Sequence, residues 1–447
     1  MEKTIGVVIA IIFAGFTAGA QTPVEFTLQQ AQAYAVKNSY QTQQLSIDAV
    51  IAQKEVNGTK AIGLPQVNGN VDFQNFLDIP TSVLPENALD PAGDPNKLIG
   101  LQFGTDYTMT AGLTATQLVF DGSYFVGLQA AKTYVLLANH NLKKSEIEMK
   151  EATTVAYYTV VVAEENLKVL EASKTNIDKT YKETKALYQS GFAEEQDADQ
   201  VKIIQTNIDN SLANAERQVK LAYDMLKFQM GLPLADTIAL ADGLETLLSE
   251  TPQESFLDKD FTFTQHIDYQ MVMTGMKLNE LNLKNEKAGY LPSLGVFVNH
   301  SQNAFRNEFN FFSGSEEWYP TTVWGVNLKV PIFSSNMRKS GLQKARLELD
   351  KSKVQQKQVE EALKLGASSA KSNYEFALRT YSNDKDNLEL ARSINKKTQI
   401  KYKEGLSTSF ELTQSENQLQ ETQGKYIGSI LQLFQAKSEL DKALSNY

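Results

Sequence analysis

Two short stretches of the chain decide its fold: Tyr188-Gln189-Ser190-Gly191-Phe192 and Tyr402-Lys403-Glu404-Gly405-Leu406. Both place a tyrosine three residues before a glycine, and a carboxylate, Asp197 or Glu411, follows six residues after it. The two glycines lie 214 residues apart, so the pattern indicates an internal duplication. Glycine tolerates the left-handed conformation that ends a helix. Each stretch is therefore predicted to be the turn between two long helices.

The sequence around both turns favours long helical hairpins, at about 123–230 and 334–444. No proline lies between Pro95 and Pro233 and none follows Pro331, so nothing forces a break. A helix from 123 to 189 would be about 100 Å long. The return limb of the first copy carries apolar residues at coiled-coil spacing, namely Val201, Ile204, Ile208, Leu212, Ala215, Val219, Ala222 and Leu226. Taken alone, this pattern also fits a plain coiled-coil rod.

Composition excludes several classes of function. The net charge is −10 and the pI is near 5.1, without a basic stripe that would neutralise nucleic-acid phosphates. Cysteine is absent, so we expect no disulfide, no thiolate zinc site and no lipid-anchored N-terminal cysteine. Histidines 140, 266 and 300 have no partner at metal-ligand spacing, and no catalytic or nucleotide-binding motif is present. The sequence therefore predicts a protein that is not an enzyme and holds no cofactor or metal.

The N-terminus predicts export. Residues 1–20 combine Lys3, an apolar run from Ile5 to Phe16, and Ala18-Gly19-Ala20, which is the pattern of a cleaved secretory signal peptide. A single transmembrane anchor is the weaker interpretation, because a spanning helix needs about 20 apolar residues. If the exported chain enters a membrane, it must therefore do so as strands.

The first repeat, residues 21–230, is predicted to place a helix and two strands before its hairpin. The helix covers 27–62, and strands are predicted at about 66–77 and 105–120, where apolar residues alternate with Gln, Asn or Thr. Residues 78–102 hold four prolines with several Asp and Asn, which predicts a long surface loop.

The second repeat, residues 263–447, follows the same plan. A helix is predicted at about 264–289, with strands at about 293–305 and 318–333. Residues 231–262, between the repeats, are predicted to form a short mixed segment around the middle of the helical bundle. The expected fold class is therefore mixed α and β, mainly α, with two repeats of strand, strand and long helical hairpin.

Four strands with one apolar face and one polar face match the dyad repeat of a membrane barrel with a wet interior. Aromatic residues near the strand ends fit interfacial girdles: Phe76, Phe103, Tyr107, Trp318 and Tyr319. The alternative is a soluble four-stranded sheet packed on a helix. Because the smallest membrane barrels use about eight strands, several chains must contribute. A trimer with twelve strands is predicted.

Further motifs carry a family resemblance. Leu64-Pro65 and Leu291-Pro292 precede the first strand of each repeat, and Val330-Pro331-Ile332-Phe333-Ser334 precedes a long helix. With the duplicated turns, these motifs resemble the TolC family of outer-membrane channel-tunnel proteins. The resemblance implies a homotrimer, with a twelve-stranded barrel in the outer membrane of a Gram-negative bacterium continuous with an α-helical barrel in the periplasm.

The same resemblance implies a function and its partners. The protein would be the exit duct of a tripartite efflux pump or of a type I secretion system. A periplasmic adaptor, or membrane fusion, protein would open the periplasmic tip and link it to an inner-membrane pump or ATP-driven exporter. Six turn residues would contact the adaptor: Tyr188, Gly191, Phe192, Tyr402, Gly405 and Leu406. Of these, Phe192 stands where the family has leucine.

Two carboxylates define the predicted constriction. The resemblance places Asp197 and Glu411 where family members have acidic side chains, whereas Gln414 stands where a further acid is expected. Threefold repetition of Asp197 and Glu411 would give a negative ring that favours cations. The simpler interpretation is that both stabilise the N-terminal end of a helix through its dipole.

The main alternative function is a periplasmic coiled-coil scaffold or adaptor protein without a membrane channel. It predicts a soluble protein, whereas the channel hypothesis predicts fractionation with the outer membrane. A stand-alone diffusion porin is disfavoured, because it has no use for the long helices.

Overall fold

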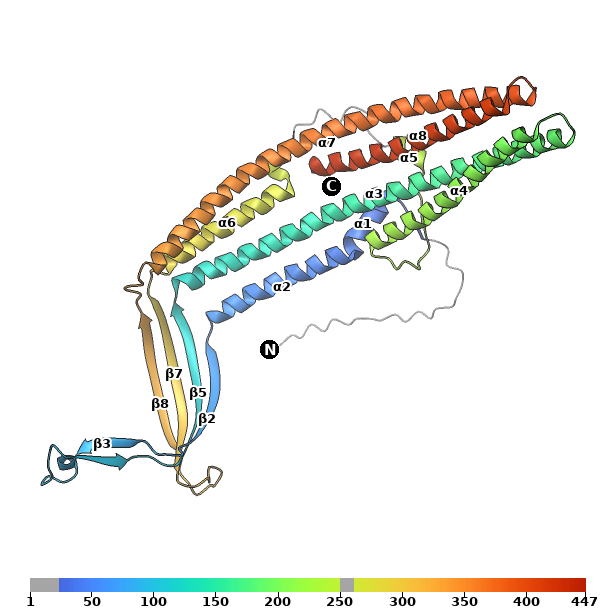
Figure 1. Ribbon diagram of the computed structural model, residues 1–447. Coiled ribbons are helices and arrows are strands. Elements are labelled where there is room, and N and C mark those ends of the chain that lie inside the picture. Colours follow the sequence, from blue (N-terminus) through green and yellow to red (C-terminus); the bar gives the residue numbers. More distant parts are fainter. Residues whose placement is uncertain (1–23, 250–260) are drawn as a thin grey trace, which may run out of the picture. The chain divides into compact units, whose positions relative to one another are not determined.

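The computed structural model describes residues 24–249 and 261–447, and this part of the chain is mainly helical with a few strands (Figure 1). The predicted signal peptide, residues 1–20, and part of the predicted segment 231–262 lie outside the described residues. The chain divides into two compact units. Among the described residues, the first unit contains 24–45, 143–249, 261–266 and 361–447, and the second contains 46–142 and 267–360.

The two long hairpins match each other in the lengths of their corresponding limbs. Helices α3 (Gly122–Gln189) and α4 (Glu195–Met230) have 68 and 36 residues. Helices α7 (Met337–Lys403) and α8 (Ser409–Ala443) have 67 and 35 residues. The duplication seen in the sequence is therefore a duplication of structure. In α4 the predicted seam is buried at Val201, Ile204, Ile208, Ala215, Ala222 and Leu226.

The first unit has an aromatic core between its helices. The ring of Tyr158 in α3 stacks on that of Phe434 in α8, with centroids 4.1 Å apart. The neighbouring Tyr157 is fully buried, and its hydroxyl donates a hydrogen bond to the backbone oxygen of Phe26, 2.9 Å away. Asp242 completes this junction, since its backbone N–H donates to the Tyr157 hydroxyl at 3.2 Å. Burial raises the pKa of Tyr157, so this hydroxyl stays protonated as a donor.

The Tyr157 junction holds a small sheet that the sequence did not predict. Strand β1 (Val24–Phe26) pairs in parallel with β6 (Ile238–Leu240), and a short helix, α5 (Leu244–Ser249), follows. The start of the first repeat, the middle of α3 and the linker after the repeat therefore meet in the first unit.

The prediction of one helix over 27–62 is wrong, because α1 (Leu28–Asn38) and α2 (Tyr40–Ile62) are separated at Ser39. The backbone of Ser39 is extended, with ψ 143°, and its hydroxyl oxygen accepts from the N–H of Thr42 at 3.4 Å. Gly231 ends α4 with φ 75° and approaches this break closely. A Cβ at that position would lie 2.3 Å from the carbonyl oxygen of Asn38.

The second unit contains a four-stranded antiparallel sheet in the order β2-β5-β7-β8. Its strands are β2 (Gln66–Asn75), β5 (Tyr107–Phe120), β7 (Ser293–Arg306) and β8 (Tyr319–Lys329). Each strand is joined at the same end of the sheet to a helix, in order α2, α3, α6 (Ile267–Ala288) and α7 (Figure 1). Among the described residues, no helix packs across either face of this sheet.

Two predictions for the sheet connections are wrong. Residues 78–102, predicted as a long surface loop, contain an antiparallel ribbon of β3 (Thr81–Pro85) with β4 (Leu98–Gln102). An ion pair of 2.6 Å between Lys97 and Glu86 closes it. The strand predicted to reach residue 333 ends at Lys329, and the segment that follows adopts positive φ at Ser335 and Asn336 before α7 begins.

No helix in the described ranges 24–249 and 261–447 is long and apolar enough to cross a membrane.

Candidate functional site: the two hairpin tips

Both hairpin tips end their first limb with the same backbone motif. Gly191 and Gly405 have φ of 79° and 72°, in the left-handed region that favours glycine. The N–H of each glycine donates to the tyrosine carbonyl three residues earlier, Tyr188 at 2.9 Å or Tyr402 at 3.0 Å. The next N–H donates to the carbonyl five residues earlier, at 2.9 and 2.8 Å. This is the Schellman pattern, which satisfies the last carbonyls of a helix.

The residues after the glycines present apolar side chains to the surroundings. Phe192 is 83% exposed and Leu406 is 72% exposed, so each tip carries one bare apolar group. Tyr188, which occupies in the first copy the position that Tyr402 has in the second, is also exposed. Side chains of this kind gain free energy when another protein covers them.

The two predicted carboxylates lie in the first turn of the return helices, where each reaches back to the residue before its helix. The backbone N–H of Glu194 donates to the carboxylate of Asp197 at 3.2 Å. In the second copy the N–H of Thr408 donates to Glu411 Oε2 at 3.0 Å, and Glu411 N–H donates to Thr408 Oγ1 at 3.2 Å. This is a capping box, which ties the start of the helix to the turn.

Glu411 has an additional donor. The hydroxyl of Ser407 donates to Glu411 Oε2 at 2.6 Å, and this bond, with the Thr408 N–H, lowers the pKa of the Glu411 carboxyl. Glu411 is therefore charged at neutral pH and holds the turn in place. Gln414, one turn further along α8, is exposed.

Near the tips the two hairpins of one chain touch each other. The hydroxyls of Tyr402 in α7 and Thr184 in α3 are 3.3 Å apart. Burial raises the pKa of Tyr402, so its hydroxyl stays protonated. Lys403 and Glu183 form an exposed ion pair of 3.3 Å alongside. An exposed pair of this kind contributes little.

An apolar contact also links the two hairpins close to the tips. Leu412 of α8 is fully buried in one cluster with Ile177 of α3 and with Val201, Ile204 and Ile208 of α4. A single leucine of the second hairpin therefore fills a site built by the first. The position of this contact, close to both turns, couples the two tips.

Sequence reasoning missed a buried polar group behind the second tip. Glu416 of α8 is buried and accepts a hydrogen bond from the amide of Gln399 in α7 at 2.7 Å. Gln399 also donates to Asn395 at 3.0 Å, and Asn395 donates to the hydroxyl of Ser415 at 3.4 Å. The spacing of Glu416 from the buried Leu412, four residues, is the signal that places it on the helix seam.

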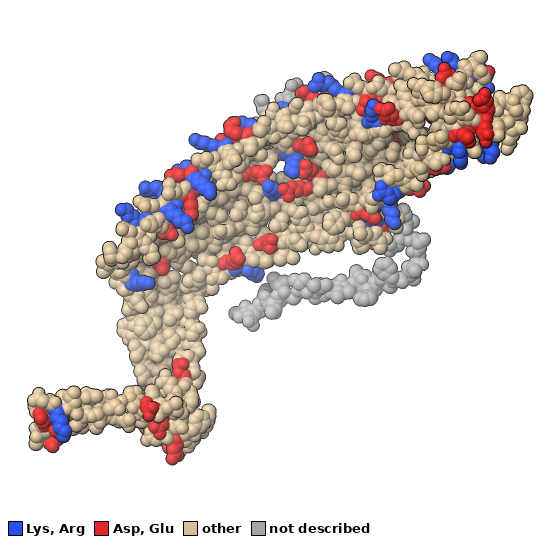
Figure 2. Space-filling model, viewed as in Figure 1, with Lys and Arg blue, Asp and Glu red and all other residues tan. Residues whose placement is uncertain are grey.

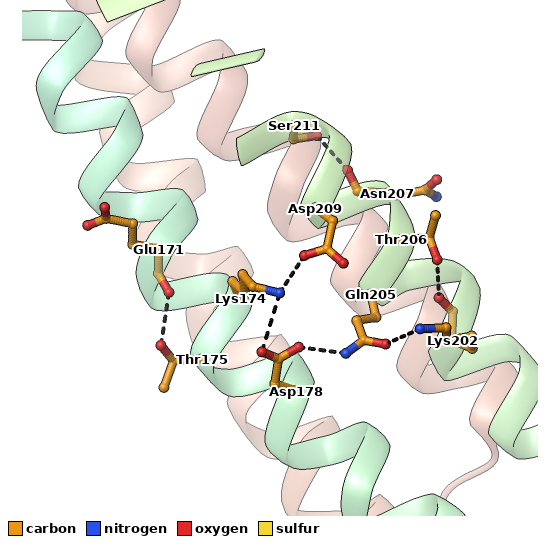
Figure 3. Close-up of polar contacts among 10 residues, drawn as sticks. All are labelled: Glu171, Lys174, Thr175, Asp178, Lys202, Gln205, Thr206, Asn207, Asp209 and Ser211. Carbon is orange, nitrogen blue, oxygen red and sulfur yellow. Dashed lines mark hydrogen bonds and ion pairs between the residues drawn. The ribbon is translucent and has the colours of Figure 1, made fainter. Parts of the chain in front are cut away.

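The first hairpin has a polar bridge between its limbs (Figure 3). Lys174 of α3 pairs with Asp209 of α4 and lies 3.4 Å from Asp178. Gln205 of α4 donates to Asp178 at 2.7 Å. The bond to Asp209 raises the pKa of Lys174, and the bond from Gln205 lowers the pKa of Asp178, so this group of charges is stable at neutral pH. The equivalent of Lys174 in the second copy, Leu388, is apolar and buried.

Comparisons with known proteins give a family match for the second repeat and longer matches to individual relatives. Residues 279–446 match the family model described as "Outer membrane efflux protein". The "Outer membrane protein TolC" of Vibrio cholerae is 24% identical over 229 residues, which cover 51% of each chain. The "Outer membrane efflux protein BepC" of Brucella suis is 20% identical over 414 residues, covering 92% of this chain and 83% of the relative. The chain thus spans about half the length of the Vibrio relative and most of the Brucella one.

Solved structures share the fold over nearly the whole chain. The outer membrane protein VceC of Vibrio cholerae superposes with a TM-score of 0.68 at 14% identity, covering 93% of this chain and 95% of that one. A structure of CusC gives a TM-score of 0.73 at 15% identity, covering 97% and 95%. The sequence match of the second repeat and the fold of both repeats agree with the resemblance found in the sequence motifs. Residues 279–446 therefore resemble the outer membrane efflux protein family, and the chain shares the fold of solved outer-membrane channels over most of its length.

Proposed function

We propose that the protein is the outer-membrane channel of a tripartite efflux pump or type I secretion system. It would act as a passive duct of three chains that an adaptor protein opens at the periplasmic tip. The observation that carries the proposal is the four-stranded sheet, which has an uncovered apolar face, a polar face and two unpaired edges. The relatives are named as outer membrane and efflux proteins, which supports a role in transport without catalysis.

The sheet has the two faces that a membrane barrel requires. One is predominantly apolar and exposed, with the large side chains Val67, Val71, Phe73, Leu113, Val296, Val298, Trp324, Val326 and Leu328. Two of the polar side chains on this face, His300 and Thr322, are joined by a hydrogen bond of 2.8 Å. The opposite face carries Thr and Asn, and these join neighbouring strands, as between Thr110 and Asn303 at 3.0 Å. Such a sheet is stable between hydrocarbon and water.

Charges are nearly absent from the four strands. Their only Asp, Glu, Lys or Arg residues are Asp72, on the polar face, and Arg306 and Lys329, at strand ends. Figure 2 shows the sheet as a surface almost free of red and blue between its two ends. The strands have 10 to 14 residues, and a membrane-spanning strand needs about 9 to 11.

The free edges call for further copies of the chain. Strands β2 and β8 form the two edges, and neither has a partner on its outer side. Unpaired backbone inside hydrocarbon costs several kcal/mol per group. Because β2 and β8 run in opposite directions, β8 of one copy would pair with β2 of the next in an antiparallel barrel. Three copies give twelve strands, enough to close a barrel that leaves a water-filled path.

The hairpin tips would be the regulated end of the duct. Phe192 and Leu406, exposed at turns that Gly191 and Gly405 shape, would contact the adaptor, with Tyr188 and Tyr402 on the limbs behind them. Asp197 and Glu411 would form a ring of negative charge near the constriction while capping their helices. Because Gln414 is uncharged, it would not add a second acidic ring. The described part of the segment 231–262 would belong to the equatorial segment around the bundle.

Cross-linking tests the barrel directly, because the chain has no cysteine of its own. Asn68→Cys in β2 is combined in turn with Thr321→Cys, Val323→Cys or Gly325→Cys in β8, all of which lie on the polar face. In outer-membrane fractions, one of the registers is expected to give a cross-linked trimer on denaturing gels. A protein that stays soluble and monomeric in all three combinations would instead be the periplasmic scaffold.

Ion selectivity tests the two carboxylates. Single-channel recordings in planar bilayers compare the unchanged protein with the double variant Asp197→Asn and Glu411→Gln. The proposed ring predicts a reduced preference for cations in the variant. An unchanged preference would mean that the two carboxylates serve only as helix caps.

A further inference from the structure

We infer that the loop between β7 and β8, residues 307–318, is a lipid anchor. It would place the rings of Phe309 and Phe312 among the acyl chains of the outer leaflet, at the rim opposite the helices. The inference rests on the proposed barrel, because it requires the apolar face of the sheet to meet lipid.

The loop folds back over the apolar face. Phe309 and Phe311 pack edge-to-face on Phe73 of β2, with centroids 5.7 and 5.8 Å apart. Phe309 also meets Tyr107 of β5 at 6.3 Å, and Phe73 and Tyr107 belong to the apolar face. A loop that joins β7 to β8 thus reaches the rings of the other two strands. The loop therefore packs against the end of the apolar face that lies opposite the helices (Figure 1).

Part of the loop forms a small core. Phe311 is 3% exposed and contacts Trp318 with centroids 6.4 Å apart. Beneath the loop, Ala304 is fully buried and Arg306 nearly so. The guanidinium of Arg306 donates to the backbone oxygen of Glu317 at 2.8 Å, which holds the returning limb in place. The loop therefore has a fixed structure that can orient exposed side chains.

Two phenylalanines at the edge of this core leave much of their rings exposed. Phe309 is 60% exposed and Phe312 is 88% exposed. Residues 309–315 contain no charged side chain, whereas Glu308, Glu316 and Glu317 flank them. This order, apolar at the centre and charged at both ends, fits a segment that dips into hydrocarbon and returns to the headgroup level.

Lipid fits this surface better than a second copy does. The copies of the proposed barrel meet at the edges of β2 and β8, whereas the exposed rings lie over the face that continues the lipid-facing strands. The β3–β4 ribbon at the same rim offers a contrast, because its tip carries Glu86, Asp90, Asp94 and Lys97 and suits water.

Tryptophan fluorescence provides the test, since the chain has only two tryptophans, Trp318 and Trp324. The anchor variant combines Phe312→Trp with Trp318→Phe and Trp324→Phe. Trp318→Phe alone leaves Trp324, exposed on the apolar face, as a reference for lipid contact. Asn87→Trp, in the background of both Trp→Phe changes, reports from the charged ribbon tip. Each protein is reconstituted into phosphatidylcholine vesicles that carry nitroxide-labelled acyl chains, and iodide serves as the aqueous quencher.

The expected result is that acyl-chain nitroxide quenches the indole at position 312 as strongly as Trp324, while iodide quenches only the indole at position 87. If Trp324 itself escapes nitroxide, the barrel proposal fails. If Trp324 is quenched by lipid but the indole at 312 is quenched only by iodide, the anchor is overturned while the barrel stands. An indole at 312 that neither reagent reaches also overturns the anchor, because protein then covers it.

Discussion

Leu412 offers the sharpest test of how the two hairpins hold each other near the tips. It is the only fully buried side chain of α8 in a cluster whose other core members, Ile177, Val201, Ile204 and Ile208, come from the first hairpin. Leu412→Ala removes three carbons from this site without touching either turn.

The cost follows from the burial. Each buried methylene contributes about 0.8 kcal/mol, and the cavity that remains adds to this loss, so the change costs about 3 kcal/mol. That free energy corresponds to a rise of about 150-fold in the equilibrium constant for local separation of the hairpins. Leu406→Ala is the matched control, because the same substitution at a 72% exposed leucine changes stability by at most about 0.5 kcal/mol.

Hydrogen exchange of the assembled protein measures both variants. In Leu412→Ala, the amides of residues 402–416 and 195–208 are expected to exchange faster by about two orders of magnitude. Leu406→Ala is expected to leave these rates unchanged while weakening capture by a cognate adaptor. Equal exchange rates in the two variants would refute the coupling of the hairpins through Leu412.

Three further predictions follow from the turns and the polar bridge. Gly405→Ala should cost about 1 to 2 kcal/mol in urea unfolding, because alanine is strained at φ 72°; Gly231→Ala should cost more, because its Cβ would also clash with backbone. The lowered pKa of Glu411 means that its stabilisation is complete above about pH 4.5 and is lost as the pH falls through the lower folded value. A spin label on the first turn of α8 should therefore become mobile in acid, and Glu411→Gln should abolish that transition. Lys174→Met should raise the hydrogen-exchange rates of α3 and α4 by less than Leu412→Ala does. Because Lys174 and Asp209 are partly exposed, salt screens their attraction, so the difference in exchange rate between this variant and the unchanged protein should shrink at high salt.

The long helices and their turns could be predicted from the sequence because the information is local and repeated. Apolar spacing defines α4, and glycine at 191 and 405 defines the turns, since no other residue fits the left-handed conformation so readily. The alternation of β2 and β5 likewise gave both faces of the sheet. These signals do not depend on distant parts of the chain.

The missed features depend on distant partners. The break at Ser39 follows from its own extended backbone and from the approach of Gly231, almost 200 residues later. The pairing of β1 with β6 joins two three-residue strands across 214 positions, too short to show a period. In the segment 78–102 the four prolines indicated a loop, although the apolar residues of β3 and β4 also fit short strands. Glu416 was overlooked because a carboxylate on a helix is usually solvated, whereas here Gln399 satisfies it.

The two bare edges of the sheet have a consequence for biogenesis. If the sheet forms the proposed barrel, a single subunit would not be a stable precursor in the bilayer, since its open strands would leave backbone groups without partners in hydrocarbon. Closure of the barrel and insertion into the membrane should accordingly be a single event. A subunit with one blocked edge should prevent closure of any barrel that contains it. When half of the subunits are defective, random mixing leaves roughly one-eighth of threefold rings intact, so such an allele should be dominant over the normal one.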